Sequence, residues 1–75
     1  MRTLCISPAG DRPGVILAGQ GSDELWFLNV DDARSYAEYC LRLTGGRTEL
    51  RDKRGNLTDW FDVPAANQDG VRFLI

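Results

Sequence analysis

Few side chains in this sequence of 75 residues could carry out chemistry, and none of them is a histidine. Without histidine the chain lacks the commonest general base at neutral pH, so Ser7, Ser22 and Ser35 cannot form a conventional Ser–His nucleophile. Cys5 and Cys40 are too few to build a metal site, and their apolar surroundings predict small core residues with reduced thiols. We therefore expect a protein without catalytic activity, cofactor or metal.

Two further patterns resemble functional sites but have simpler explanations. Asp52 and Asp59 are predicted to face each other across a hairpin, where paired carboxylates can share a proton or hold a divalent cation. No third ligand accompanies them, so the charged end of a hairpin is the favoured interpretation. The segment Gly19-Gln20-Gly21 lacks the Gly-Lys-Ser/Thr ending and the following helix of a phosphate-binding loop, and it predicts a hairpin turn.

The pairs Trp26-Phe27 and Trp60-Phe61 are the most informative feature of the chain. Both lie in stretches typical of β-strands, where neighbouring side chains point to opposite faces of a sheet. Each pair therefore puts a large aromatic side chain on both faces, and the pattern does not say which of the two is buried. The sequence has residues for one convincing helix, which covers one face, so aromatic surface remains for contact with a partner.

The net charge of −2 hides an uneven distribution. Six acids against two bases give residues 11–38 a net charge of −4, and five bases against two acids give residues 42–54 a net charge of +3. Three acids and no base give residues 55–70 a net charge of −3. This pattern predicts a surface that steers a charged partner, beside the alternative of a solvated surface of mixed sign.

The first candidate surface is the outer face of two strands expected at residues 47–54 and 57–63. In the predicted register the Arg51 guanidinium lies against the Trp60 ring, a cation–π contact of about 0.5–1 kcal/mol when exposed. Exposed Trp and Arg side chains often dominate protein interfaces. A self-contained surface pair and a nucleic-acid-binding platform stay open as alternatives. The expected contact residues are Arg47, Arg51, Lys53 and Trp60.

The second candidate surface is an acidic rim at the two ends of the strand around Trp26-Phe27. Carboxylates beside an aromatic side chain can mimic nucleic-acid phosphates and dock into a basic groove of a partner. The alternative is a solubilising turn followed by the N-terminus of a helix. The residues of this rim, which we expect around Trp26 or Phe27, are Asp23, Glu24, Asp31 and Asp32.

The order of elements predicts an α+β fold, β-β-β-α-β-β-β, with an antiparallel sheet of about five or six short strands and one helix packed on one face. The strand at residues 25–28 is apolar on both faces, which favours a central position. A two-residue turn at Gly55-Asn56 places Leu50 opposite Phe61. The expected strands span residues 3–7, 15–18, 25–28, 47–54, 57–63 and 71–75.

The helix is expected to begin after Val30 with Asp31 as its N-cap, and to end at Thr44-Gly45-Gly46, where Gly45 suits a left-handed C-cap. Its apolar residues recur at helical spacing and predict one stripe facing the sheet. The residues of that stripe are Ala33, Tyr36, Ala37, Cys40, Leu41 and Leu43.

The length indicates a single domain over residues 1–75. The first ten residues contain no apolar run typical of a signal peptide, and no stretch approaches the roughly 20 apolar residues of a membrane span. We therefore expect a cytoplasmic protein that does not bind membranes.

Residues 37–63 carry a resemblance to small domains of unknown function in bacteria and phages. A helix that ends in Gly45-Gly46 precedes a charged strand, the segment Asp52-Lys53-Arg54-Gly55-Asn56, and a strand that ends in Trp60-Phe61. This arrangement is similar to short domains built from a β-hairpin, a helix and a second β-hairpin. In size and charge alone the chain also resembles anti-CRISPR inhibitors of phages, which implies a protein that blocks a host complex by direct contact.

Together these features predict a protein-binding module, in the form of a small acidic inhibitor or regulator whose partner belongs to a nucleic-acid-binding complex. The first alternative is a nucleic-acid-binding module that uses the basic strand 42–54 with Trp60. The low net charge makes it the weaker one. The second alternative is a homodimer that buries the spare aromatic face.

Overall fold

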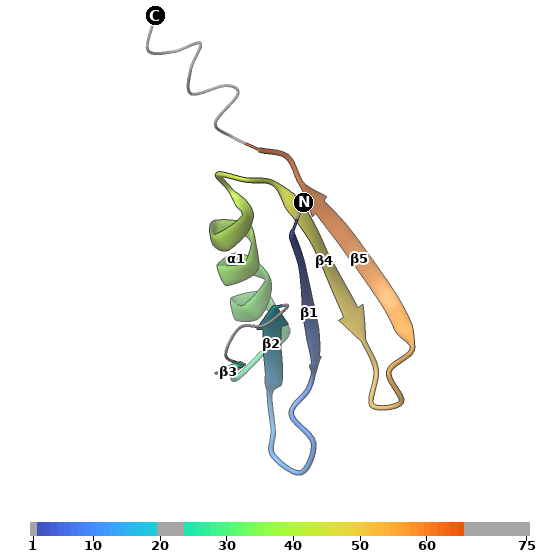
Figure 1. Ribbon diagram of the computed structural model, residues 1–75. Coiled ribbons are helices and arrows are strands. Elements are labelled where there is room, and N and C mark those ends of the chain that lie inside the picture. The colour runs from blue at the N-terminus through green and yellow to red at the C-terminus, as the bar shows by residue number, and fades with distance from the viewer. Residues whose placement is uncertain (1, 20–23, 66–75) are drawn as a thin grey trace, which may run out of the picture.

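The computed structural model describes residues 2–19 and 24–65 of the chain. Among these residues the sheet has the strand order β3-β2-β1-β4-β5, and α1 packs on one of its faces (Figure 1). The predicted α+β class is confirmed. No described helix is long and apolar enough to cross a membrane. The elements are β1 (Arg2–Pro8), β2 (Val15–Gly19), β3 (Leu25–Phe27), α1 (Val30–Leu41), β4 (Gly46–Arg51) and β5 (Leu57–Val63).

The sheet is mixed, which corrects the prediction of a wholly antiparallel sheet. Three pairs of neighbouring strands are antiparallel, whereas β1 and β4 run parallel, with Arg2 opposite Gly46 and Ile6 opposite Leu50. The cause is the path of the chain after β3. Helix α1 returns it across the sheet, so that β4 enters beside β1 in the same direction. The terminal strand expected at residues 71–75 lies outside the described residues.

Strand β3 lies at an edge of the sheet, and the prediction of a central position is wrong. It has three residues, of which Leu25 and Trp26 are exposed. The central strand is β1, whose Leu4 and Ile6 are buried under α1. The strand β3 is apolar for another reason. Trp26 packs on the loop between β1 and β2, and Leu25 lies on the side of the sheet that faces α1.

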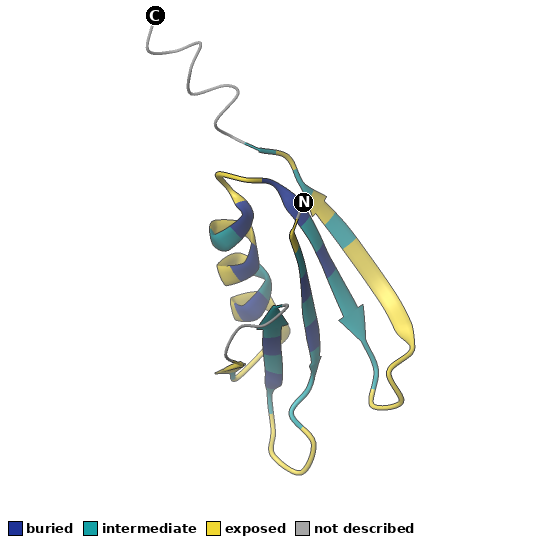
Figure 2. Cartoon of the chain, in the orientation of Figure 1, coloured by how far each residue is buried: buried dark blue, intermediate teal, exposed yellow. Residues whose placement is uncertain are grey.

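The core lies between α1 and the middle of the sheet. Small side chains on α1 let the helix approach the strands closely, and the large side chains come mainly from β1 and β2. Figure 2 shows the buried residues recurring along the side of α1 that faces the sheet. The buried core residues are Leu4, Ile6, Val15, Leu17, Ala33, Ala37 and Leu41.

The ends of α1 are capped by neighbouring polar groups. Asn29, and not Asp31 as predicted, is the N-cap, since its extended backbone lets Oδ1 accept the N–H of Asp32 at 2.9 Å. Asp31 and Asp32 instead occupy the first turn, where the helix dipole favours negative charge. At the other end Gly45 adopts a φ of 75°, as predicted, and donates to the Leu41 carbonyl at 2.7 Å.

The hairpin of β4 and β5 has a different register from the predicted one. Its turn contains three residues, Lys53–Gly55, because the Asp52 carboxylate accepts the N–H groups of Arg54 and Asn56, each at 2.9 Å. A bulge beside Leu50 and Arg51 shifts the pairing once more. The longer turn and the bulge together shift the pairing by two residues over most of the ladder. An even shift leaves each side chain on its predicted face.

This register separates the two carboxylates that were expected to face each other. Asp59 lies opposite Leu50, whereas Asp52 belongs to the turn, where backbone N–H groups hold it. The predicted Asp52–Asp59 pair is therefore wrong. Thr48 stands opposite Phe61, and Lys53 lies in the exposed turn instead of the strand.

Candidate functional site: the open face of the sheet

The face of the sheet opposite α1, called here the open face, is covered by no element among the described residues. Its side chains follow from the strand alternation, since Leu4 and Ile6 point to α1 and the residues between them point away. The register continues this face across all five strands. Its residues include Trp26, Ile16, Ala18, Thr3, Cys5, Ser7, Arg47, Glu49, Arg51, Trp60 and Asp62.

Both tryptophans lie on the open face, and the phenylalanine that follows each of them lies on the side of α1. Trp26 is 45% exposed and Trp60 is 47% exposed. Phe27 contacts the Tyr36 ring of α1, with the ring centroids 5.6 Å apart. Phe61 packs against the core from β5. The open face therefore carries one half-exposed indole at each edge, from β3 and from β5.

The cationic partner of Trp60 is Arg47, and the predicted contact with Arg51 is wrong. The Arg47 guanidinium carbon lies 4.3 Å from the centroid of the Trp60 ring. Arg47 Nε also donates to Asp62 Oδ1 at 3.0 Å, which fixes the guanidinium over the ring. The shift in register explains the exchange: Glu49 stands directly opposite Trp60, and Arg47 becomes its diagonal neighbour.

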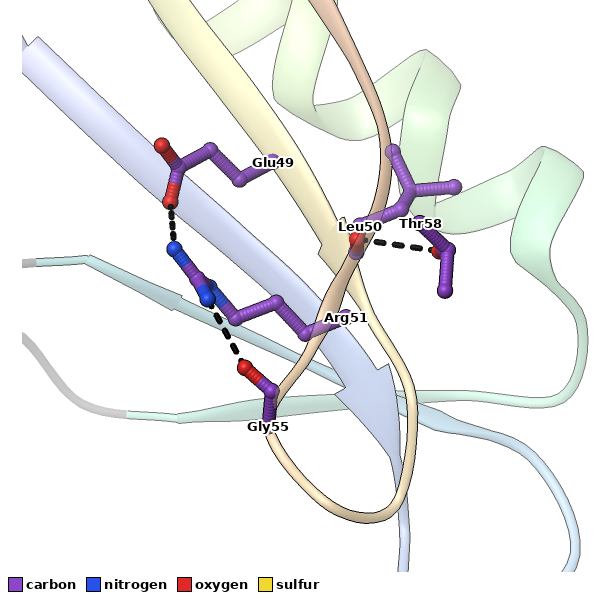
Figure 3. A network of polar contacts seen from close by, with 5 residues as sticks. All are labelled: Glu49, Leu50, Arg51, Gly55 and Thr58. Carbon is purple, nitrogen blue, oxygen red and sulfur yellow. Dashed lines mark hydrogen bonds and ion pairs between the residues drawn. The ribbon is translucent and has the colours of Figure 1, made fainter.

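Arg51 is occupied by contacts within the hairpin. Its two terminal nitrogens donate to Glu49 Oε1 at 2.9 Å and to the Gly55 carbonyl at 2.8 Å (Figure 3). The hydrogen bond that Arg51 donates to Glu49, together with the negative charge of that carboxylate, raises the pKa of Arg51. Thr58 Oγ1 donates to the Leu50 carbonyl at 3.0 Å beside the bulge. Arg51 thus stabilises the turn, and Arg47 is the arginine that faces outward with Trp60.

The charges of the open face are balanced. Its two arginines are paired with its two acids, Arg47 with Asp62 and Arg51 with Glu49. Of the three other bases of residues 42–54, Lys53 and Arg54 lie in the exposed turn and Arg42 follows the last residue of α1. A surface that stacks and neutralises a nucleic acid needs cations directed at phosphates. Both arginines of this aromatic face are instead paired with acids.

Trp26 is held by the loop between β1 and β2. Its Nε1 donates to the Pro13 carbonyl at 2.9 Å. The ring lies so close to Gly14 that a Cβ atom at that position would be 2.8 Å from Nε1. Gly14 has a φ of 96°, which favours glycine. Sequence reasoning treated this loop as a connection only, although Pro13-Gly14 was the signal of a tight turn able to receive an aromatic ring.

The structure divides the predicted acidic rim. Glu24 is exposed just before β3, and Asp23 lies outside the described residues. Asp31 and Asp32 are exposed in the first turn of α1, on the opposite side of the sheet from Trp26. These two helical acids therefore lie on the same side of the sheet as Phe27, and the rim does not surround the open face.

The remaining candidates for chemistry are dispersed. Cys5 lies half-buried on the open face, whereas Cys40 lies half-buried on α1. Within residues 2–19 and 24–65 no group of three potential ligands could hold a metal ion. Hydrogen bonds from the N–H groups of Asn56 and Arg54 lower the pKa of Asp52, which marks this carboxylate as part of the turn.

Comparison with protein-family models, curated proteins and solved structures finds no match for this chain. The geometry of the open face is thus the basis for a functional proposal.

Proposed function

We propose that the protein is a non-enzymatic protein-binding module that docks on its partner through the open face. The observation that carries this proposal is the pair of half-exposed tryptophans, Trp26 and Trp60, at the two edges of one neutral face. Tryptophan and arginine are the side chains that most often dominate protein interfaces. Trp60 brings both together, since Arg47 lies over its ring.

The dimensions of the open face suit a protein surface. Four strand spacings of about 4.8 Å put β3 and β5 roughly 19 Å apart. Between the two indoles the face carries small side chains at Cys5, Ser7 and Ala18 and larger ones at Ile16, Glu49 and Arg51. Two aromatic anchors roughly 19 Å apart fit within the patch of about 800 Å² that each partner buries in a standard interface.

The anchors are held in place before any partner arrives. Asp62 clamps Arg47 over Trp60, and the Pro13 carbonyl holds the indole of Trp26. Side chains that are ordered in the free protein lose less conformational entropy on binding, which leaves more of the contact free energy as affinity. Preorganised aromatic anchors therefore support a binding function over a passive surface.

Within this class we propose an acidic inhibitor or regulator of the phage type, similar in action to anti-CRISPR proteins, which blocks a host complex by direct contact. The net charge of −2 and the acids flanking β3 support it, because they favour approach to a basic partner. Glu24, Asp31 and Asp32 then act in steering, while Trp60 and Arg47 supply the contact.

The test is affinity capture from a lysate of the native host, with and without nuclease, followed by measurement of the affinity for the purified partner. We expect one stoichiometric protein partner that survives nuclease. Trp60→Ala should weaken its binding by about 2 kcal/mol or more, roughly 30-fold. The matched control is Leu25→Ala, which truncates an exposed apolar side chain on the α1 side of the sheet, opposite the buried Leu17.

Two outcomes contradict the proposal. The first is a folded Trp60→Ala variant that binds with full affinity, which would mean that the open face is not the interface. The second is recovery of nucleic acid, with loss of every protein partner on nuclease treatment, which would favour the nucleic-acid-binding alternative and make Trp60 a stacking residue.

A further inference from the structure

Helix α1 presents a second apolar stripe beside the buried one, and only the half-buried Cys40 of this stripe packs against the core. Tyr36, Tyr39, Cys40 and Leu43 recur at the spacing i, i+3, i+4 and i+7, with Leu43 in the turn that ends the helix. We call these four residues the α1 stripe. Tyr39 is 66% exposed and Leu43 is 68% exposed. The prediction of a single stripe facing the sheet is therefore wrong for Tyr36 and Leu43, which are exposed.

The two stripes point in different directions. At about 100° per residue, the α1 stripe is rotated roughly 110° from the buried stripe of Ala33, Ala37 and Leu41. It extends over the side of the sheet where β3 forms the edge, since Tyr36, Cys40 and Leu25 line one shared cavity of about 150 Å³. The exposed side of α1 is visible in Figure 2.

The aromatic side chains of the stripe are ordered. Phe27, Tyr36 and Tyr39 form a series, with ring centroids 5.6 Å and then 6.2 Å apart. The Arg42 guanidinium lies 5.9 Å from the Tyr39 ring and borders the stripe. An ordered row of exposed apolar side chains on a small domain marks an interaction surface.

The spacing identifies the kind of partner. Apolar residues at i, i+3, i+4 and i+7 are the seam through which one helix packs on another, with the axes 8–10 Å apart. The charges along the seam identify its direction: the first turn of α1 carries Asp31 and Asp32, and Arg42 follows its last residue. A helix with this polarity is complementary to an antiparallel copy of itself.

We propose that a second copy of this chain docks on the α1 stripe, with the two α1 helices antiparallel about a twofold axis near Tyr39. Arg42 of each copy then reaches toward the acidic half of the other helix, and the two helix dipoles oppose each other favourably. A twofold interface repeats each contact, which makes a self-complementary stripe sufficient. The dimer leaves both open faces accessible, so this inference goes beyond the binding function proposed above.

Sedimentation equilibrium on the full chain tests the inference. The chain mass is 8.4 kDa, so a dimer has twice that mass, about 17 kDa. A seam of four residues per copy buries less than a standard interface, and we expect a Kd in the micromolar range, measurable at about 100 μM protein. Tyr39→Glu and Leu43→Glu should each give the monomer mass, because they place a charge in the seam.

The control variant is Leu57→Glu, which adds the same charge at an exposed apolar position on β5. It should keep the dimer mass. Circular dichroism verifies that each variant is folded, and the exposure of Tyr39 and Leu43 means that the core is unchanged. A charge exchange then tests the direction: Arg42→Asp should raise the dimer Kd, and Asp32→Arg combined with Arg42→Asp should restore it.

Three results overturn the inference. The first is a wild-type chain that stays at 8.4 kDa at about 100 μM. The second is a dimer that persists unchanged in both Tyr39→Glu and Leu43→Glu. The third is a dimer that dissociates in Leu57→Glu, which would place the contact on the sheet. Failure of the charge exchange to restore the dimer overturns the antiparallel arrangement. None of these measurements involves Trp60, so they are independent of the capture experiment.

Discussion

The hydroxyl of Thr48 offers a direct test of the core. Thr48 is fully buried on β4, between Leu4 of β1 and Phe61 of β5, and its Oγ1 has no hydrogen-bond partner among the described residues. A buried polar group without a partner costs about 1–3 kcal/mol in desolvation. Valine keeps the β-branched shape and replaces the hydroxyl with a methyl group, which suits a strand interior.

We therefore expect Thr48→Val to raise the free energy of unfolding by about 1–2 kcal/mol. For a domain of this size each kcal/mol corresponds to a rise in Tm of about 4–8 °C. Urea denaturation followed by tryptophan fluorescence measures the change, and an unchanged m-value verifies that the unfolding reaction is the same.

The matched control is Thr58→Val, which makes the same substitution where the hydroxyl is used. Thr58 Oγ1 donates to the Leu50 carbonyl at 3.0 Å, so its loss should destabilise the protein by about 0.5–1.5 kcal/mol. The opposite sign of the two substitutions is the expected signature. A Thr48→Val protein that is destabilised by about 1 kcal/mol or more would refute the reasoning, because it would mean that the hydroxyl is hydrogen-bonded.

Three further predictions concern the loops and caps. Gly14→Ala should destabilise the protein by about 1–3 kcal/mol and redshift the fluorescence of Trp26, because its Cβ would collide with the Phe27 carbonyl oxygen at a positive φ. Asn29→Ala should cost about 1 kcal/mol in thermal unfolding, more than Asp31→Ala, since only Asn29 caps α1. The pKa of Asp52 is lowered from its ordinary value of 3.8, so its stabilising contribution is present above that pH and is lost as the pH falls through the folded pKa. In urea denaturation at pH 7 and pH 3, Asp52→Asn should therefore lose less stability on acidification than the wild type.

Local signals predicted the local structure well. The glycines after the helix set its end, since Gly45 takes the left-handed conformation that only glycine adopts readily. The inward position of Thr48 and the outward position of Arg47 followed from strand alternation. These two positions were predicted correctly although the register was wrong. The shift over this part of the ladder was two residues, and an even shift preserves the face of every side chain.

The errors have causes that local patterns do not contain. The Gly55-Asn56 dipeptide suggested a two-residue turn, but the Asp52 carboxylate organises a three-residue turn, and Arg47 thereby replaces Arg51 over Trp60. The parallel pairing of β1 with β4 depends on which strands meet across the whole sheet. A strand's own residues specify its faces and say little about its neighbours.

The parallel pair of β1 and β4 also governs how the chain can fold. Each of residues 2–6 of β1 meets a partner 44 positions later, as Arg2 with Gly46 and Ile6 with Leu50. The two β-hairpins that flank this pair close over short loops and can form in microseconds. The strands β1 and β4 can pair only after the long segment between them has brought them together. The rate-limiting step is thus expected at the joint between the N-terminal and C-terminal halves. Substitutions at Leu4 or Thr48 should change the folding rate more than those at the outer hairpin edges.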